Sequence, residues 1–451
     1  MNVRVLGWFD DRLGIATTAR RGLRKVFPDH WSFLLGEIAL FCFVILVATG
    51  TFLTLFYRPD AAEVVYQGPY APLQGREVSA AYESVMRISF EVRAGLVMRQ
   101  IHHWAALVFV AAVVVHAMRI FFTGAFRKPR ELNWLIGVVL LILALGAGFT
   151  GYSLPDDLLS GTGLRIAYSV LISVPFVGPY LAFLAFGGEF PTSGIISRLF
   201  VMHVMLLPAL MIGLIVAHLA ILWRQKHAQF AGGRATETNV VGKPFWPGQV
   251  FKSVGLLLVT GSVLAFMGGL IQINPVWDYG PFNPTVVSAP AQPDWYIGWL
   301  EGALRLFPPL DIEIFGILIP SPFIPGVVIP GIAFGLMALW PFVEARMTGD
   351  GEPHHLLDRP RDVPFRTGIG VAALIFFLLL TLAGGNDVMA IMFDVQVEAV
   401  TNVLRIGVIV LPALGGLIAH RMAVQLQSSA PSTPARRVRL RRNPEGGFDE
   451  D

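Results

Sequence analysis

Cysteine and charge are what this sequence has least of. Its 451 residues include one cysteine, Cys42, so the chain can form no internal disulfide and hold no cysteine-ligated iron–sulfur cluster. It also lacks the C-x-x-C-H motif that attaches a c-type haem. Charged residues make up only 14% of the chain, which excludes an ordinary soluble domain. The formal net charge of +3 comes without the soluble basic domain that a nucleic-acid-binding protein would need, so we expect no nucleic-acid partner.

The sequence is instead rich in long apolar segments. Hydrophobic residues make up 54% of the sequence, and eight segments are long and apolar enough to cross a bilayer as helices. These segments are residues 33–56, 100–122, 133–152, 198–222, 250–272, 314–342, 367–386 and 402–422. The sequence therefore predicts an all-α transmembrane fold with eight helices.

Lysine and arginine are distributed unevenly between the two sides of the expected membrane. They concentrate in residues 1–31, 119–134, 223–252, 343–366 and the tail from 420. The positive-inside rule then predicts a multi-pass protein of the plasma membrane with both termini in the cytoplasm. The first thirty residues are basic and amphipathic, without the pattern of a cleavable signal peptide.

Four histidines lie in pairs within two of the apolar segments. His102 and His116 are fourteen residues apart, and His203 and His218 are fifteen apart. Fourteen residues return a helix to nearly the same face about 21 Å further along, and Pro208 can absorb the larger offset of the second pair. A single buried histidine is more often a packing residue, but four ionisable side chains at matched depths favour function. Two facing helices could hold two b-type haems, each with one histidine from either helix.

Glycines repeat the same spacing in two neighbouring segments. Gly36 and Gly50 are fourteen residues apart, as are Gly137 and Gly151. A missing side chain at each haem level would let a flat macrocycle approach the backbone. Small residues also mediate ordinary helix packing in membranes, but the shared period favours the haem interpretation.

Two arginines lie near the candidate ligands. Arg99 and Arg119 are each three residues from a histidine, on the adjoining helical turn, where a guanidinium could pair with a haem propionate. For Arg119 the alternative is an interfacial positive-inside residue. His103 points about 100° away from His102 around the helix, and we interpret it as a bystander.

The segments TGAFRKPRELNW (123–134) and GYSLP (151–155) carry a resemblance to a known family. The chain resembles cytochrome b of the cytochrome bc complexes along nearly its whole length, in both photosynthetic and respiratory forms. Near its end, HHLLDRPRDVPFRTGIG (354–370) and LAGGNDVMA (382–390) resemble the actinobacterial respiratory reductases. The resemblance implies an outer haem on His102 and His203 and an inner haem on His116 and His218.

A four-residue motif matches the quinol-oxidation motif PEWY of that family, with aspartate in place of glutamate. It consists of Pro293, Asp294, Trp295 and Tyr296. A carboxylate there would accept a proton from the quinol hydroxyl, and the tyrosine would shape the pocket. The alternative is a loop aspartate that caps the following helix. Gly163 matches the small residue at the wall of the quinol pocket.

The inner quinone-reduction pocket departs from the family pattern. Gln249 stands where relatives commonly have an acid at the start of the fifth helix. Glu37 is a candidate substitute proton donor. Arg224 and Lys226 could lie at the mouth of this pocket, or extend to the interface as ordinary cations.

Photosynthetic relatives carry a third, covalently attached haem on a first-helix cysteine. Leu34 stands at the matching position here, and Cys42 lies about two turns deeper. We expect Cys42 to be a buried small hydrophobe and expect no covalent third haem. His354 and His355 fall in a cytoplasmic loop and are not counted as ligands.

The expected organisation has five parts. Residues 1–32 form an amphipathic cytoplasmic N-terminus, 33–222 a four-helix di-haem bundle, 223–249 a cytoplasmic linker, 250–422 a four-helix portion with the quinol site, and 423–451 a disordered tail.

The resemblance implies a quinol–cytochrome c oxidoreductase that translocates protons. Menaquinol would be oxidised near the outer face, and quinone reduced on the cytoplasmic side. Implied partners are a Rieske iron–sulfur protein, a c-type cytochrome, a second copy of the complex and a terminal oxidase in a supercomplex. The alternatives are a photosynthetic-type quinol reductase, a haem-bearing anchor of a dehydrogenase, and a transporter. The anchor would leave the PDWY motif unexplained, and the transporter would need broken helices at the midplane.

Overall fold

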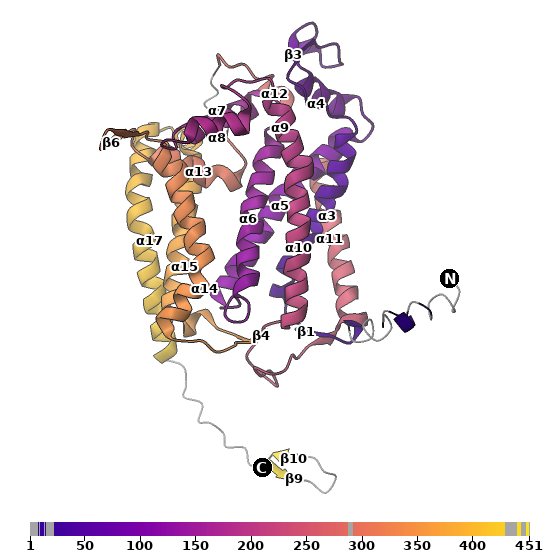
Figure 1. Cartoon of the computed structure of the whole chain (residues 1–451), viewed down its shortest axis with the longest axis vertical. Coiled ribbons are helices and arrows are strands. Elements are labelled where there is room, and N and C mark those ends of the chain that lie inside the picture. The colour runs from indigo at the N-terminus through magenta and orange to yellow at the C-terminus, as the bar shows by residue number, and fades with distance from the viewer. Residues whose placement is uncertain are drawn as a thin grey trace.

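Helices dominate the structure, a computed structural model that describes residues 8, 10–12, 14, 22–286, 292–428, 440–442 and 448–450. The long helices stand side by side, and short helices and hairpins cover the two ends (Figure 1). This arrangement follows from the apolar runs, because a backbone in lipid must satisfy its hydrogen bonds within each segment.

Within the described residues, eight helical segments are long and apolar enough to cross a membrane. Their main helices are α3 (Leu34–Thr54), α5 (Gly95–Phe122), α6 (Glu131–Tyr152), α9 (Ile195–Val201) continued by α10 (Leu207–Gln225), α11 (Val250–Leu270), α14 (Ile329–Thr348), α15 (Pro364–Gly384) and α17 (Val397–Ser428). The predicted eight-helix, all-α transmembrane fold is confirmed.

The sixth span begins later than the sequence analysis expected. Instead of starting near residue 314, it covers Ile324–Thr348. The preceding residues form an antiparallel hairpin of β6 (Ile312–Ile314) and β7 (Ile317–Ile319). Gly316, at φ +76°, makes the turn, and the prolines that follow β7 disfavour a continuous helix.

Shorter elements cover the end of the bundle that is uppermost in Figure 1. They are α4 (Ala80–Phe90), α7 (Leu158–Ile172), α8 (Gly178–Phe186), α12 (Val276–Tyr279), α13 (Trp295–Leu306), α16 (Asn386–Phe393) and the hairpin of β2 (Glu63–Val65) and β3 (Glu77–Ser79). The PDWY motif lies here, because α13 begins at its tryptophan.

The opposite end is held by short sheets between distant segments. β1 (Val26–Phe27) pairs with β5 (Lys243–Pro244), and β4 (Gln229–Phe230) pairs in parallel with β8 (Leu356–Leu357). The second pair joins the segment after α10 to the loop between α14 and α15, so both halves of the chain contribute to this face.

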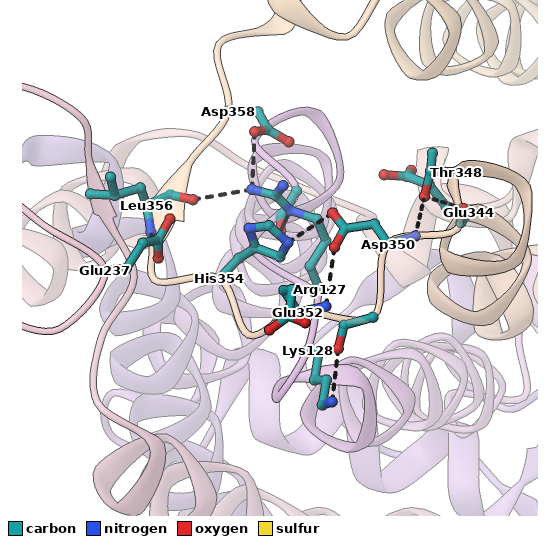
Figure 2. A network of polar contacts seen from close by, with 12 residues as sticks. Arg127, Lys128, Glu237, Glu344, Thr348, Asp350, Glu352, His354, Leu356 and Asp358 are labelled. Atoms are coloured by element: carbon teal, nitrogen blue, oxygen red, sulfur yellow. Dashed lines mark hydrogen bonds and ion pairs between the residues drawn. The ribbon is translucent and has the colours of Figure 1, made fainter.

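A polar network strengthens that junction (Figure 2). Arg127, in the turn between α5 and α6, donates to the carbonyl of Leu356 at 3.1 Å and pairs with Asp358 at 3.0 Å. His354 contacts the Asp350 carboxylate at 2.8 Å. His354 thus lies in the loop between α14 and α15, beside the turn that precedes α6, where its carbonyl accepts from Arg130.

Two groups of helices pack within the bundle. In one, α5 packs against α3 and α11 while α6 packs against α10; in the other, α15 packs against α13 and α17. The sequence analysis had assigned α11 to the second portion. Gly268 explains its position, because a Cβ there would lie 2.8 Å from the backbone nitrogen of Ile101 on α5. Only glycine permits so close an approach.

The last helix runs further than expected. α17 continues to Ser428, so the first residues of the segment 423–451, expected to be disordered, are helical. Further along, β9 (Leu440–Arg442) pairs with β10 (Phe448–Glu450) in an antiparallel hairpin.

Candidate functional site

One histidine pair faces a cavity of about 490 Å³, which we call the first cavity. His102 lies on α5 and His203 in the π-helical turn that joins α9 to α10. Their ring centroids are 6.1 Å apart at an interplanar angle of 73°. A metal ion bound by both imidazoles would give the same separation of ring centres. Two metal–nitrogen bonds of about 2 Å, plus about 1 Å from each ligating nitrogen to the centre of its ring, add up to about 6 Å. The pair therefore fits one metal ion between its rings.

Hydrogen bonds orient both rings for such ligation. Thr49 Oγ1 is 2.9 Å from Nδ1 of His102 and donates its own hydrogen to the carbonyl of Ile45 at 2.7 Å. Nδ1 of His102 therefore donates to Thr49. Nδ1 of His203 donates to the carbonyl of Ala147 at 2.9 Å. Both Nε2 atoms keep a free lone pair, as metal-ligating histidines require.

The other pair, His116 and His218, lines a second cavity of about 740 Å³. Nδ1 of His116 is buried without a hydrogen-bond partner among the described residues. Fourteen helical residues separate His116 from His102, so these two histidines lie about 21 Å apart along α5. Phe109, between them on the same helix, lines both cavities.

The four glycines make room for the histidine rings. A Cβ atom at Gly36 would lie 3.1 Å from Cε1 of His116, and one at Gly50 would lie 3.1 Å from Cε1 of His102. At Gly151 a Cβ would lie too close to the His203 ring, at 2.4 Å from Cε1, whereas at Gly137 it would lie 3.8 Å from Cε1 of His218, an ordinary contact. The sequence analysis had explained these glycines by approach of a macrocycle to the backbone. In the structure the group that faces each glycine is an imidazole ring.

Each cavity also has an arginine with unsatisfied nitrogens. Arg99 lines the first cavity; its Nη2 donates to the carbonyl of Asn274 at 3.1 Å. Arg119 lines the second, with its guanidinium 4.3 Å from the ring centre of Phe33. Nε of both, and Nη2 of Arg119, are buried with no partner in the described chain. Buried cations need an anion, and a haem propionate fits this requirement.

The PDWY carboxylate points into the first cavity. Both carboxylate oxygens of Asp294 accept from Nε2 of His103, at 2.9 and 3.0 Å. Tyr296 donates its hydroxyl to Asp294 at 3.0 Å. Burial and this carboxylate hold the pKa of Tyr296 well above its usual range, so the hydroxyl stays protonated. These three residues form a connected polar group on the cavity wall.

This geometry changes two interpretations made from the sequence. Asp294 precedes α13 but makes no side-chain capping hydrogen bond within the described residues, so the capping alternative is wrong. His103 is no bystander to the site, because it holds the motif's carboxylate. The sequence signal was its position beside His102. That position could be interpreted only with the knowledge that α13, which carries the motif, lies next to α5.

The remaining quinol-site candidates do not belong to the described lining of the first cavity. The described lining of the first cavity includes Tyr152 and omits Gly163, Pro293 and Trp295. A Cβ at Gly163 would lie 2.7 Å from the Tyr152 hydroxyl, so this glycine provides space for that tyrosine. The Trp295 side chain is largely exposed.

A second carboxylate lines the other cavity. Glu37 accepts from Nε2 of Gln249 at 2.7 Å and from the Ser253 hydroxyl at 2.7 Å. The structure thus brings two of the four predicted inner-site residues together on α3 and the start of α11, while Lys226 is exposed and absent from the described lining. Arg224 is exposed and absent from the described lining.

The sequence analysis missed several charged or polar residues around the second cavity. Lys252, Arg130 and His227 all line it. Arg130 is held by the carbonyl of His354 at 2.6 Å and by Nδ1 of His355 at 2.9 Å. Burial and nearby cations lower the pKa of His227 to about 4, so it is neutral at physiological pH.

Cys42 is fully buried. It packs in the core cluster with Ala39, Phe43 and Ala105. The expectation that it is a small hydrophobic core residue is confirmed.

Comparisons with known proteins agree with this architecture. The family described as Cytochrome b(N-terminal)/b6/petB matches residues 107–281. The chain is 50% identical over 420 residues to the cytochrome bc1 complex cytochrome b subunit of Corynebacterium efficiens, covering 93% of this chain and 77% of that protein. It is 50% identical over 445 residues to the subunit of the same name from Mycobacterium tuberculosis, covering 98% and 81%.

A solved structure has the same fold. It is described as a hyperthermophilic respiratory Complex III and is similar with a TM-score of 0.66 and 21% identity, covering 92% of this chain and all of that one. The resemblance seen in the sequence is therefore confirmed. The chain belongs to the cytochrome b family, as a cytochrome b subunit of a bc1-type respiratory complex III.

Proposed function

We propose that this subunit oxidises menaquinol at the first cavity and returns electrons to quinone at the second. The observation that carries the proposal is that each cavity combines a histidine pair with a carboxylate in its lining, the buried Asp294 in the first and the half-buried Glu37 in the second. Quinone redox chemistry couples electrons to protons, so each site needs both an electron carrier and a proton-exchanging group.

Family membership implies b-type haem, and we propose two. His102 and His203 would hold one, with Arg99 toward its propionates, and His116 and His218 the other. Both would supply one-electron carriers between the two quinone sites. The ring separation of 6.1 Å and the oriented Nδ1 atoms support this at the first cavity.

At the first cavity, residues of this chain accept the proton that quinol releases. Asp294 accepts it from the quinol hydroxyl, while His103 and Tyr296 fix the orientation of the carboxylate. The aspartate is one methylene shorter than the glutamate of the family motif, and the hydrogen bond from His103 on α5 draws it into the cavity. Because His103 binds Asp294 and is adjacent to His102 in the chain, the proton acceptor would lie close to the proposed electron carrier.

At the second cavity Glu37 supplies a proton to the reduced quinone. Gln249 and Ser253 donate to its two oxygens, which fixes the orientation of the carboxylate at the cavity wall. Lys252 and Arg130 give this cavity a positive character that favours a quinone gaining negative charge.

Membership in complex III implies partner subunits such as a Rieske protein and a cytochrome c. We propose that the first cavity faces outward, toward these partners, and that both termini lie in the cytoplasm of a plasma-membrane protein. A homodimer of the complex and a supercomplex with a terminal oxidase complete the proposed assembly.

A spectroscopic and chemical analysis of the purified complex tests this proposal. A reduced-minus-oxidised spectrum, with haem extraction and quinone analysis, should give two extractable b haems per chain and bound menaquinone. Quinol–cytochrome c turnover in the same sample should be lost when Asp294 and Glu37 are both replaced by amides. A single b haem, or full turnover in the double variant, would refute it.

A further inference from the structure

A cluster of polar side chains beside α13 has no role in the mechanism above. At its centre is Asp387, in the segment 382–390 that carries part of the resemblance seen in the sequence. Nε2 of Gln292 donates to Oδ1 of Asp387 at 2.7 Å, and Nη1 of Arg305 lies 3.0 Å from the same oxygen. Gln292 directly precedes the PDWY motif, whereas Arg305 lies near the other end of α13.

This arrangement joins the two ends of a helix through one carboxylate. Ten residues of α-helix separate Trp295 from Arg305, a rise of about 15 Å. Side chains on a helix lean toward its N-terminus, so the long Arg305 side chain extends back in the direction of Gln292. Both meet at Asp387, which lies outside α13 in the first turn of α16. We call these three residues, Gln292, Asp387 and Arg305, the clasp.

Further contacts fix the position of Arg305. Glu301, one turn earlier on the same helix, accepts from Nε of Arg305 at 2.9 Å. Asn386 accepts from Nη1 of Arg305 at 2.6 Å and donates to the Thr401 hydroxyl of α17 at 2.8 Å. Arg305 therefore has two carboxylate partners, Glu301 and Asp387, and its guanidinium is held from both α13 and α16.

Backbone contact between α13 and α15 fixes Asp387 relative to α13. A Cβ at Gly302 would overlap the carbonyl oxygen of Leu380, and one at Gly384 would overlap that of Gly298. Only glycine allows two helices to approach this closely. Since Asp387 follows the end of α15 by three residues, this packing sets the distance over which Gln292 must reach it.

The clasp ends two residues before the carboxylate that faces the first cavity. Pro293 lies between Gln292 and Asp294, and its ring restricts the backbone there to a narrow range of φ. Within the described chain the backbone of Gln292 makes no hydrogen bond to other backbone groups, so the side-chain contact of the clasp holds this segment. His103 and Tyr296 hold the carboxylate of Asp294 itself. The segment is thus attached both at its carboxylate and at the residue where it begins.

We propose that Asp387 is a positioning residue for quinol oxidation, acting through Gln292 to hold the Asp294 carboxylate at the wall of the first cavity. This inference rests on the proposed function of Asp294. Neither Asp387 nor Gln292 belongs to the described lining of that cavity, so both act through Asp294. A displacement of about 1 Å caused by a distant substitution can lower a rate by about 10²-fold, so the second attachment has a kinetic consequence.

Two substitutions open the clasp at different points. Gln292→Leu removes the donor and leaves a side chain of similar size, and Asp387→Ala removes the acceptor. Asp387→Asn is the conservative variant, because its amide oxygen can still accept from Gln292. The matched control is Thr401→Val, an isosteric change that removes the hydrogen bond from Asn386 in the same cluster but leaves the contact between Gln292 and Asp387.

The test measures steady-state turnover of the purified complex with cytochrome c against the concentration of a reduced naphthoquinol. We expect Gln292→Leu and Asp387→Ala to lower kcat roughly tenfold with little change in KM, because the quinol still binds while its proton acceptor is misplaced. Asp387→Asn should recover most of this loss, and Thr401→Val should keep the wild-type kcat. Reduced-minus-oxidised spectra should show both b haems in every variant.

A double variant separates positioning from a purely structural role. In the Asp294→Asn background, Gln292→Leu should lower turnover no further, since the carboxylate that it positions is gone. The inference is overturned if Gln292→Leu lowers turnover by the same factor in both backgrounds, or leaves kcat unchanged in the wild-type background. It is also overturned if Asp387→Asn or Thr401→Val is as slow as Asp387→Ala. Failure of the proposed function would look different, because Asp294→Asn alone would then leave turnover unchanged.

Discussion

At the residue scale, Asp294 carries the chemistry assigned to the first cavity. Its side chain is 8% exposed and bound by His103 and Tyr296. Asp294→Asn should lower quinol oxidation roughly 10²-fold, the low end for a general base, because water can partly replace it. Steady-state quinol–cytochrome c turnover measured against pH checks this.

The matched variant is Asp294→Glu, which restores the family's side chain and should retain most activity. Both variants should bind both haems with ordinary spectra, because Asp294 ligates neither. Near-normal turnover and an unchanged pH profile in the asparagine variant would leave the motif a structural role only.

His103 gives a second prediction at this scale. His103→Asn removes the hydrogen bonds to both oxygens of Asp294, so we expect turnover to fall roughly tenfold, less than in Asp294→Asn because the carboxylate remains. Haem spectra should stay unchanged, since His102 remains the ligand. Loss of one haem signal would instead identify His103 as the true ligand of α5.

Glu37 gives a third prediction, at the second cavity. Glu37→Gln preserves the size of the side chain but removes the acid that Gln249 and Ser253 hold. Reoxidation of the haem at His116 and His218 by quinone should slow, while its reduction by quinol continues. Rapid-mixing spectroscopy resolves the two phases, and unchanged rates in both would make Glu37 a structural interfacial carboxylate.

The sequence identified single residues best where one helix carried the whole pattern. The four histidines and four glycines followed from a period of fourteen to fifteen residues, which needs only helix geometry. The partnership of His103 with Asp294 joins positions 191 residues apart, and that of Gln292 with Asp387 joins positions 95 residues apart. No local pattern encodes such contacts.

At the element scale, α5 and the α9–α10 helix carry the four histidines that would hold the proposed haems. Each would take one histidine from either element, so the two sites should be lost separately. His116→Leu or His218→Leu should eliminate the haem of the second cavity while leaving part of the signal from the first. Reduced-minus-oxidised spectra of the purified complex measure both, and normal binding of two haems in either variant would contradict the ligand assignment.

The two glycines of α6 differ in the space beside them, and this difference allows a further prediction at this scale. A Cβ at Gly151 would overlap the ring of His203, whereas one at Gly137 would lie 3.8 Å from Cε1 of His218, an ordinary contact. Gly151→Ala should therefore displace His203, at a cost of about 1–3 kcal/mol typical of overpacking, and lower the haem content of the first cavity. Gly137→Ala is the control and should keep both haems; equal haem content in the two variants would contradict the packing account.

The elements themselves were predictable to within a few residues, with instructive exceptions. Long apolar runs located the spans, but residues 314–319, most of the hairpin, were taken for the start of a helix because a short apolar run cannot be assigned to helix or strand from its periodicity alone. The position of α11 against α3 and α5 could not be read from its own residues. It depends on Gly268 meeting the backbone of Ile101, a contact between segments far apart in the chain.

At the scale of the whole molecule, the two cavities lie at different depths of one bundle, and charge differs between them. The first gathers carboxylates, Asp157 and Asp294, around a single cation, Arg99. The second gathers three cations, Arg119, Arg130 and Lys252, around two carboxylates, Glu37 and Asp29, the latter paired with Lys252, so cations outnumber carboxylates in its described lining. Carboxylates suit a site that takes protons from quinol, and cations suit a site where quinone gains electrons.

The most direct test of this account follows the two b haems after rapid mixing of the oxidised complex with a reduced naphthoquinol, comparing wild type with Glu37→Gln and Asp294→Asn. The account predicts that both haems are reduced and then reoxidised in wild type and that both stay reduced in Glu37→Gln. In Asp294→Asn their reduction should be roughly 10²-fold slower. Reduction at the wild-type rate in Asp294→Asn, together with unchanged reoxidation in Glu37→Gln, would contradict quinol oxidation at the first cavity and quinone reduction at the second.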